Sequence, residues 1–138
     1  ALAEYGLSLE APGIHLLECE CDAQGGFEGL HALWQARERP TAVIAMADVI
    51  AIGAMQAARE LGVRIPEDLS IIGYDGIDAG ALTCPALTTV CQPTLEKGRV
   101  AAQLLLQRIE LGPLEAEQIV LPVELVERES FCGLGGQG

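Results

Sequence analysis

Short apolar runs alternate with longer amphipathic stretches along this chain, and the alternation is the strongest constraint on its fold. Strands that are separated by helical crossovers form a parallel sheet with helices on both faces. The predicted strands are 14–20, 41–46, 69–74 and 87–91, with extended segments near 118–122 and 124–129. The predicted helices are 1–9, 24–37, 48–61 and 94–110. The sequence therefore predicts an α/β fold, a parallel sheet flanked by helices.

The length and charge of the chain limit what it can do. Its 138 residues are enough for one domain with a hydrophobic core. The formal net charge is −12 and no Lys/Arg cluster is present, so we do not expect this chain alone to bind DNA. Neither a signal peptide nor an apolar run long enough to span a membrane is visible.

The five cysteines follow no zinc-like pairing, which favours a reducing cytoplasm over a secreted disulfide scaffold. On the predicted strand 14–20, His15, Cys19 and Cys21 would share one face. Such a set can bind a metal, but packing on a buried strand is the more common role, so no metal site and no cofactor is predicted.

Two of the predicted helices need a covering surface. The helix at 48–61 has almost no polar face, so its own sheet and a second surface must cover it. The helix at 94–110 carries an apolar stripe that needs a floor, formed by Leu95, Val100, Leu104, Leu105 and Ile109.

Polar residues follow four of the predicted strands, at the edge of the sheet where ligands bind in open α/β folds. Asp22 and Asp48 each precede a helix, so we expect both to cap backbone N–H groups. Asp75 precedes an irregular loop, where it can contact a ligand or form an Asx turn. Gln92 can contact a ligand or tie down the crossover that follows it.

No catalytic group of residues is visible. The chain has no nucleophile elbow, no H-E-x-x-H, no phosphate loop and no Rossmann glycine signature. His15 and His31 have no placed partner. We therefore predict a binding module and not an enzyme.

Three segments resemble the effector-binding core of lac-repressor-type (LacI/GalR) transcription regulators. They are RPTAVIAMADVIAIGAMQAARELGVRIPEDLSIIGYDG, PALTTVCQP and LPVELVERES, in the order and spacing of that family. The resemblance covers about residues 1–130 and implies a periplasmic-binding-protein-like lobe, mostly the carboxyl-terminal one of two. The effector would bind in the cleft between the lobes.

The resemblance also implies a domain organisation. Residues 1–130 would be the carboxyl-terminal portion of the core, with the helix 94–110 completing the other lobe and its apolar stripe lacking a floor here. The glycine-rich end, 131–138, is predicted to be a flexible tail. The DNA-binding headpiece is expected to lie outside this sequence, so DNA would be a partner only through it.

Asp75 takes, by resemblance, the place of the carboxylate that hydrogen-bonds the effector. Three further ligand positions depart from the family pattern. Ala47 replaces the usual Asn, Ala23 replaces a stacking aromatic residue, and Thr94 stands where some members have another aromatic residue. Each change removes a hydrogen bond or a stacking face. Gly76 replaces the second acid of a usual pair.

The apolar helix 48–61 takes, by the same resemblance, the place of a helix in the dimer interface beside the loop before Pro85. The candidates for that contact are Val49, Ile50, Ile52, Gln56 and Leu82. Burial of the helix within one subunit is the alternative.

The resemblance predicts a cytoplasmic homodimeric regulator whose DNA binding is controlled allosterically by a small polar effector, a sugar or a similar compound. A periplasmic solute-binding protein of a transporter, which has the same fold, is the alternative function. The free cysteines and the RIPEDLS segment favour the regulator.

Overall fold

The computed structural model describes residues 4, 6, 8–9, 11–112 and 118–133. Its helices are α1 (Ala23–Trp34), α2 (Asp48–Leu61), α3 (Asp78–Ala81) and α4 (Thr94–Leu111). Its strands are β1 (Ala42–Ile44), β2 (Ser70–Asp75), β3 (Thr88–Cys91) and β4 (Glu124–Val126). The strands form one sheet in the order β1-β2-β3-β4.

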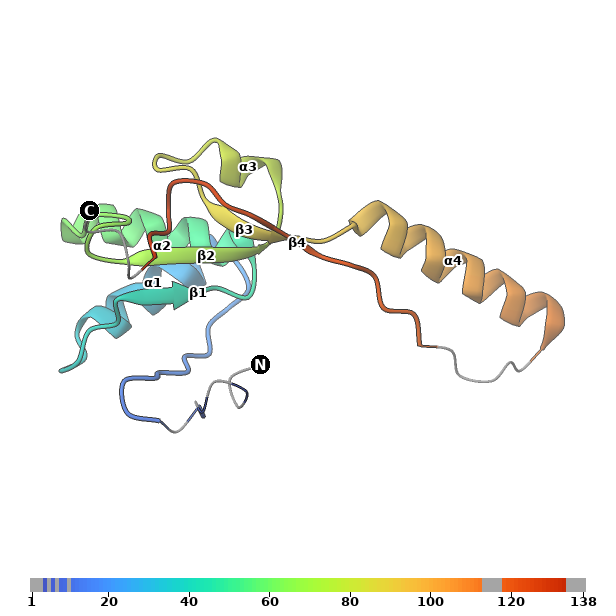
Figure 1. The fold of residues 1–138 in the computed structure, drawn as a ribbon, viewed down its shortest axis with the longest axis horizontal. Coiled ribbons are helices and arrows are strands. Elements are labelled where there is room, and N and C mark those ends of the chain that lie inside the picture. The colour runs from blue at the N-terminus through green and yellow to red at the C-terminus, as the bar shows by residue number, and fades with distance from the viewer. Residues whose placement is uncertain (1–3, 5, 7, 10, 113–117, 134–138) are drawn as a thin grey trace.

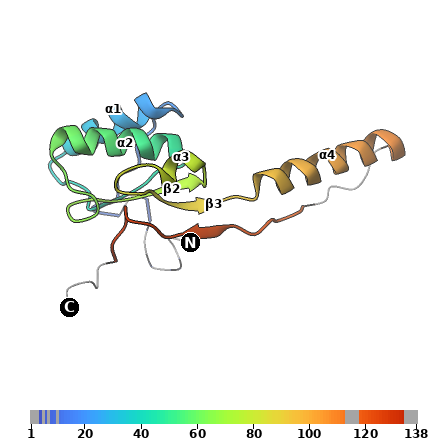
Figure 2. The same ribbon diagram turned by 90° about the horizontal axis from the view of Figure 1, so that it is seen from above.

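The first three strands of the sheet are parallel and the fourth is antiparallel to its neighbour. The parallel pairs confirm the predicted α/β class, whereas β4 makes the sheet mixed. The chain leaves the sheet after β3, runs out along α4 and returns past the same point, so β4 lies against β3 in the opposite direction (Figure 1). In Figure 2, α1, α2 and α3 lie on one side of β2 and β3.

The core consists of small aliphatic side chains between α2 and the sheet. Ala51, Ala57 and Ala58 of α2 are fully buried, as are Leu69 and Ile71 beside them. Burial of this apolar area is the main force that holds α2 on the sheet.

Helix α1 covers the other flank of α2 through glycine contacts. A Cβ atom on Gly26 would lie 2.0 Å from the carbonyl oxygen of Ile50, and one on Gly53 would lie 1.8 Å from that of Ala23. Only glycine permits so close an approach of two helix backbones. Part of the second surface that was predicted to cover α2 is therefore α1, a helix of the same chain.

A polar strap fixes the carboxyl-terminal segment to the sheet. The hydroxyl of Ser130 donates to the carbonyl of Ile71 at 2.6 Å and accepts from the backbone N–H of Thr88 at 2.8 Å. The N–H of Cys132 donates to the hydroxyl of Ser70 at 3.2 Å. The predicted flexible tail 131–138 stays a prediction: residue 132 is bonded to the sheet, and residues 134–138 lie outside the described part of the chain.

Helix α4 projects away from the sheet (Figure 1). None of its residues is buried. Leu95, Leu105 and Ile109 of the predicted apolar stripe are 93%, 60% and 70% exposed, while Val100 and Leu104 are half-buried. The stripe is covered by no other element among the described residues, and its place in a second lobe stays a prediction.

Three predicted elements differ from the structure. Segment 14–20 lies in no strand, because its backbone forms no ladder with β1 or any other described strand, and Leu16 is 73% exposed. Residues 118–122 likewise pair with no strand. Of the predicted helix 1–9, the described residues 4, 6, 8 and 9 lie in no α-helix, and the others are outside the described ranges.

A matched pair of glycine substitutions tests the α1–α2 contact. We expect Gly53→Ala to lower the free energy of unfolding by about 1–3 kcal/mol, because the new methyl group must push α1 away. Gly98→Ala on α4 is the control: nothing lies within 4 Å of its Cβ position. It should raise helix stability by about 0.5–1 kcal/mol. Urea denaturation measures both, and equal stabilities of the two variants would contradict the contact.

Candidate functional site

The carboxyl ends of β2 and β3 place Asp75 and Gln92 side by side. Asp75 is the last residue of β2 and pairs in register with Cys91, the last residue of β3. Gln92 follows directly. The structure confirms that both residues lie at the carboxyl edge of the parallel strands, where α/β folds bind ligands; their role in ligand binding stays a prediction.

Asp75 has a strained backbone. Its φ angle is 118°, the single positive value for a residue other than glycine in the described part of the chain, and Gly76 follows at 78°. Such conformations cost about 1–3 kcal/mol and persist only where surrounding contacts impose them, and they cluster at functional sites.

The side chains of Asp75, Gln92 and Lys97 form a hydrogen-bonded chain. The amide Nε2 of Gln92 donates to Oδ1 of Asp75 at 2.8 Å, and Nζ of Lys97 donates to Oε1 of Gln92 at 3.0 Å. Both roles considered for Gln92 remain open, since it contacts the carboxylate and also bonds the first turn of α4. The carboxylate of Asp75 forms no Asx turn among the described residues, because its hydrogen bond is to Gln92.

Asp48 does not cap its own helix, contrary to the prediction. Ala47 is the N-cap residue of α2 and its side chain caps nothing. The carboxylate of Asp48 is fully buried and accepts from N–H of Gly76 at 2.9 Å, from N–H of Ile77 at 2.8 Å and from the hydroxyl of Thr89 at 2.6 Å. The carboxylate prefers these donors because they satisfy it inside the core, where an unpaired charge is costly.

The structure separates the remaining predicted ligand positions. Thr94 is exposed and its N–H donates to the carbonyl of Gln92 at 2.9 Å, so it belongs to the rim. Ala47 is buried beside Asp48. Ala23 is exposed at the start of α1, with its carbonyl against Gly53. Before it, Asp22 caps α1 as predicted, accepting from N–H of Gly25 at 2.7 Å.

The sequence did not single out Lys97 or Thr89. Lys97 has no signal of its own, because its relation to Gln92 exists only once β3 leads into α4. The sequence did contain one indication of the buried Asp48 carboxylate. Gly73 lies inside a strand, where glycine often marks the close approach of another group to the backbone. A Cβ atom at Gly73 would lie 2.1 Å from Oδ1 of Asp48.

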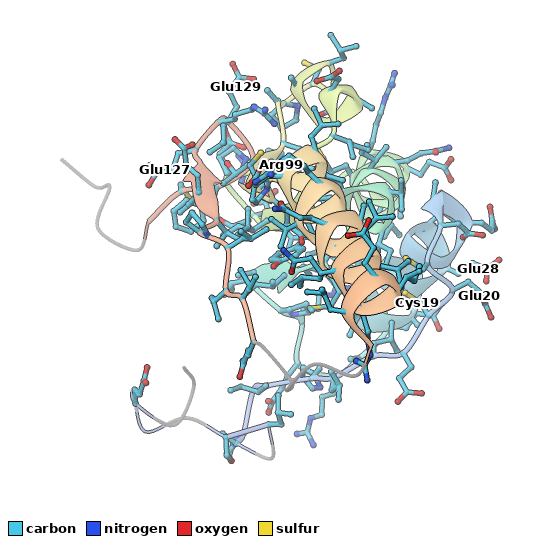
Figure 3. All side chains as sticks on the ribbon, turned by 90° about the vertical axis from the view of Figure 1, so that its right-hand side faces the viewer. Cys19, Glu20, Glu28, Arg99, Glu127 and Glu129 are labelled. Carbon is cyan, nitrogen blue, oxygen red and sulfur yellow. The ribbon has the colours of Figure 1, made fainter. Side chains whose placement is uncertain are left out.

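The considered metal group of His15, Cys19 and Cys21 does not assemble in the structure. No cluster of three His, Cys, Asp or Glu side chains that could hold a metal ion occurs among residues 11–112 and 118–133 or the few described before them. Cys19 instead borders a hollow of about 300 Å³ between residues 17–22 and α1, with Glu20 and Glu28 (Figure 3). This hollow is not at the rim of Asp75.

An ion pair closes the turn that leads into β2. Asp68 accepts from the guanidinium and the backbone N–H of Arg64. These hydrogen bonds lower the pKa of Asp68 to about 2. The pair is exposed, so it fixes the turn more than it stabilises the fold.

The comparisons with known proteins agree with this fold. The family model described as "Periplasmic binding protein-like domain" matches residues 8–131. The chain belongs to this family. Within the described residues, no helix has both the length and the apolar character required to cross a membrane.

The relatives of the chain are transcription regulators of the LacI type. It is 42% identical over 134 residues to the ribose operon repressor of Haemophilus influenzae, covering 97% of this chain and 40% of that protein. It is 40% identical over 130 residues to the PurR repressor of Photorhabdus laumondii, covering 94% and 38%. The chain thus spans about 40% of the length of these relatives.

A solved structure extends the same likeness to three dimensions. The LacI family regulator of Enterococcus faecium with bound ribose superposes with a TM-score of 0.80 at 38% sequence identity. The match covers 94% of this chain and 47% of that one. The resemblance predicted from the sequence is therefore confirmed: the chain corresponds to the effector-binding core of LacI-family regulators.

Replacing Thr89 tests the buried carboxylate. Thr89→Val keeps the shape of the side chain but removes the donor to Asp48, so the free energy of unfolding should fall by about 1–3 kcal/mol. Thr41→Val is the control, because Thr41 is exposed and its hydroxyl makes no hydrogen bond among the described residues. Thermal denaturation followed by circular dichroism compares them. A Thr89→Val variant as stable as the control would show that the contact contributes nothing.

Proposed function

We propose that this chain is the effector-sensing and dimerisation part of a LacI-type transcriptional repressor. It supplies one wall of a cleft that binds a small polar ligand, a sugar or a related metabolite, and binding changes the affinity of a separate headpiece for DNA. The observation that carries the proposal is the strained carboxylate of Asp75, held by Gln92 at the carboxyl end of β2.

The chemistry of the rim favours binding over catalysis. The described residues around Asp75 provide a carboxylate, an amide, an ammonium group and a hydroxyl, which exchange hydrogen bonds with hydroxyl groups of a ligand. No activated nucleophile or acid–base pair accompanies them in the described part of the chain. Binding is also the function favoured by the relatives, which are named as repressors.

A cytoplasmic regulator is favoured over a periplasmic carrier by the relatives, which are named as repressors. The five cysteines also favour a reducing compartment, because their number is odd and their spacing follows no zinc-like pairing. With a net charge of −12, this chain contributes sensing and assembly, and DNA contacts fall to another part of the regulator.

The proposed dimer surface, defined here as Val49, Ile50, Ile52, Gln56 and Leu82, includes both exposed and half-buried residues. Val49 and Leu82 are 37% and 85% exposed, and Gln56 is exposed. Ile50 and Ile52 pack partly against the core. The exposed apolar members, Val49 and Leu82, support the surface because contact with a partner would remove their apolar area from water.

Substitution of Asp75 in the intact regulator tests the sensing role. Asp75→Asn removes the charge and still tolerates the positive φ angle, so the affinity for the effector should fall at least about tenfold while the fold is kept. Asp78→Asn is the control, an exposed carboxylate three residues further on. Calorimetry against a panel of sugars, nucleosides and small acids measures both variants. Unchanged affinity in Asp75→Asn would remove the carboxylate from the ligand site.

Substitution of Leu82 tests the dimer surface without disturbing the core. Leu82→Glu should convert the dimer to a monomer, because it places a charge at a contact that must be dry, while Ala32→Glu on α1 should leave the dimer intact. Ile52→Glu should have the same effect as Leu82→Glu, with an added loss of stability from the core side of the residue. Light scattering distinguishes the states, and a persistent dimer in Leu82→Glu would refute the surface.

A further inference from the structure

Lys97 is a cation at the rim that no acid among the described residues neutralises. Its Nζ bonds the neutral amide of Gln92 at 3.0 Å, and it forms no ion pair with any described residue. The neighbouring Arg99 is bound to Glu96, and Arg64 is bound to Asp68. Several other basic side chains also form no ion pair among the described residues, but Lys97 is the basic residue that is hydrogen-bonded to Gln92 beside Asp75.

Two groups at the rim have unused hydrogen-bonding capacity that a ligand can take up. Oδ1 of Asp75 accepts from Gln92, whereas its Oδ2 has no donor in the described part of the chain. Nζ of Lys97 uses one of its three N–H groups for Gln92. One end of the rim therefore accepts hydrogen bonds from hydroxyl groups, and the other donates to an anion.

The two ends lie within reach of one small molecule. Bonds of 2.8 Å and 3.0 Å on either side of the Gln92 amide put Oδ1 of Asp75 and Nζ of Lys97 no more than about 8 Å apart. Recognition of a ligand at this rim would then rest mainly on the Asp75 and Lys97 ends.

We propose that the effector is a polyhydroxylated anion, with its hydroxyl groups on Asp75 and its acidic group on Lys97. This inference rests on the proposed sensing function and specifies its ligand class. The acidic group is a carboxylate, as in a sugar acid, or a phosphate, as in a sugar phosphate. Both bind an ammonium group through charge-assisted hydrogen bonds.

Calorimetry on the intact regulator with matched ligands tests the proposal. The panel contains glucose, gluconate, glucuronate and glucose 6-phosphate, and ribose, ribonate and ribose 5-phosphate. In at least one series an acidic member should bind about tenfold or more tightly than the neutral sugar, and the preferred acid identifies carboxylate or phosphate as the group. Lys97→Met should abolish this preference, whereas Lys97→Arg should retain it.

Arg108→Met is the matched control, because it removes the same charge from the last turn of α4, far along the helix from Gln92. It should keep the preference for the acid. The inference is overturned if neutral sugars bind as tightly as acids, or if Lys97→Met binds acids as the unaltered protein does; sensing of a neutral sugar through Asp75 then still stands. Absence of binding to every ligand, neutral and acidic, would contradict both the inference and the sensing function.

Discussion

The buried carboxylate of Asp48 is the interaction on which the rest of the site depends. It joins three elements, because it stands at the first turn of α2 and accepts hydrogen bonds from the loop after β2 and from Thr89 of β3. A buried charge is tolerated only when its hydrogen bonds are complete, so the loop has little freedom to move away. The positive φ angle of Asp75 directly precedes the anchored N–H of Gly76. The strain at the rim is thus maintained from inside the core.

The same region depends on space that glycine leaves. Gly73 makes room for the Asp48 carboxylate, and Gly26 and Gly53 let α1 and α2 approach to backbone contact. These positions explain how a chain with few aromatic residues builds a dense core: it brings backbones together instead of filling gaps with large side chains. The buried alanines of α2 follow the same scheme.

The parts of the fold that the sequence predicted are those with a local signal. The predicted helix 48–61 has the bounds of α2. The predicted strand 69–74 differs from β2 by one residue at each end, and 87–91 differs from β3 by one residue at its start. The sequence pattern gave a wrong prediction where a strand depends on a hydrogen-bonded neighbour. Segment 14–20 has apolar residues typical of a strand, but it pairs with no strand of the sheet. In the candidate site, the predicted ends of the strands indicated Asp75 and Gln92. The partners of Asp48 could not be predicted because they are distant in sequence, and the position of Lys97 depends on the path of α4. The ligand role of Asp75 and the dimer surface stay predictions.

The rim and the core divide their tasks between different side chains. Asp48, Thr89 and Gly73 are buried and hold the architecture, whereas Thr94 and Lys97 are exposed on the first turn of α4. Exposed positions away from such networks change stability by no more than about 0.5 kcal/mol. Under the proposed function, exchanges at residues 94 and 97 would alter the ligand that is recognised while the buried scaffold of Asp48, Thr89 and Gly73 stays the same.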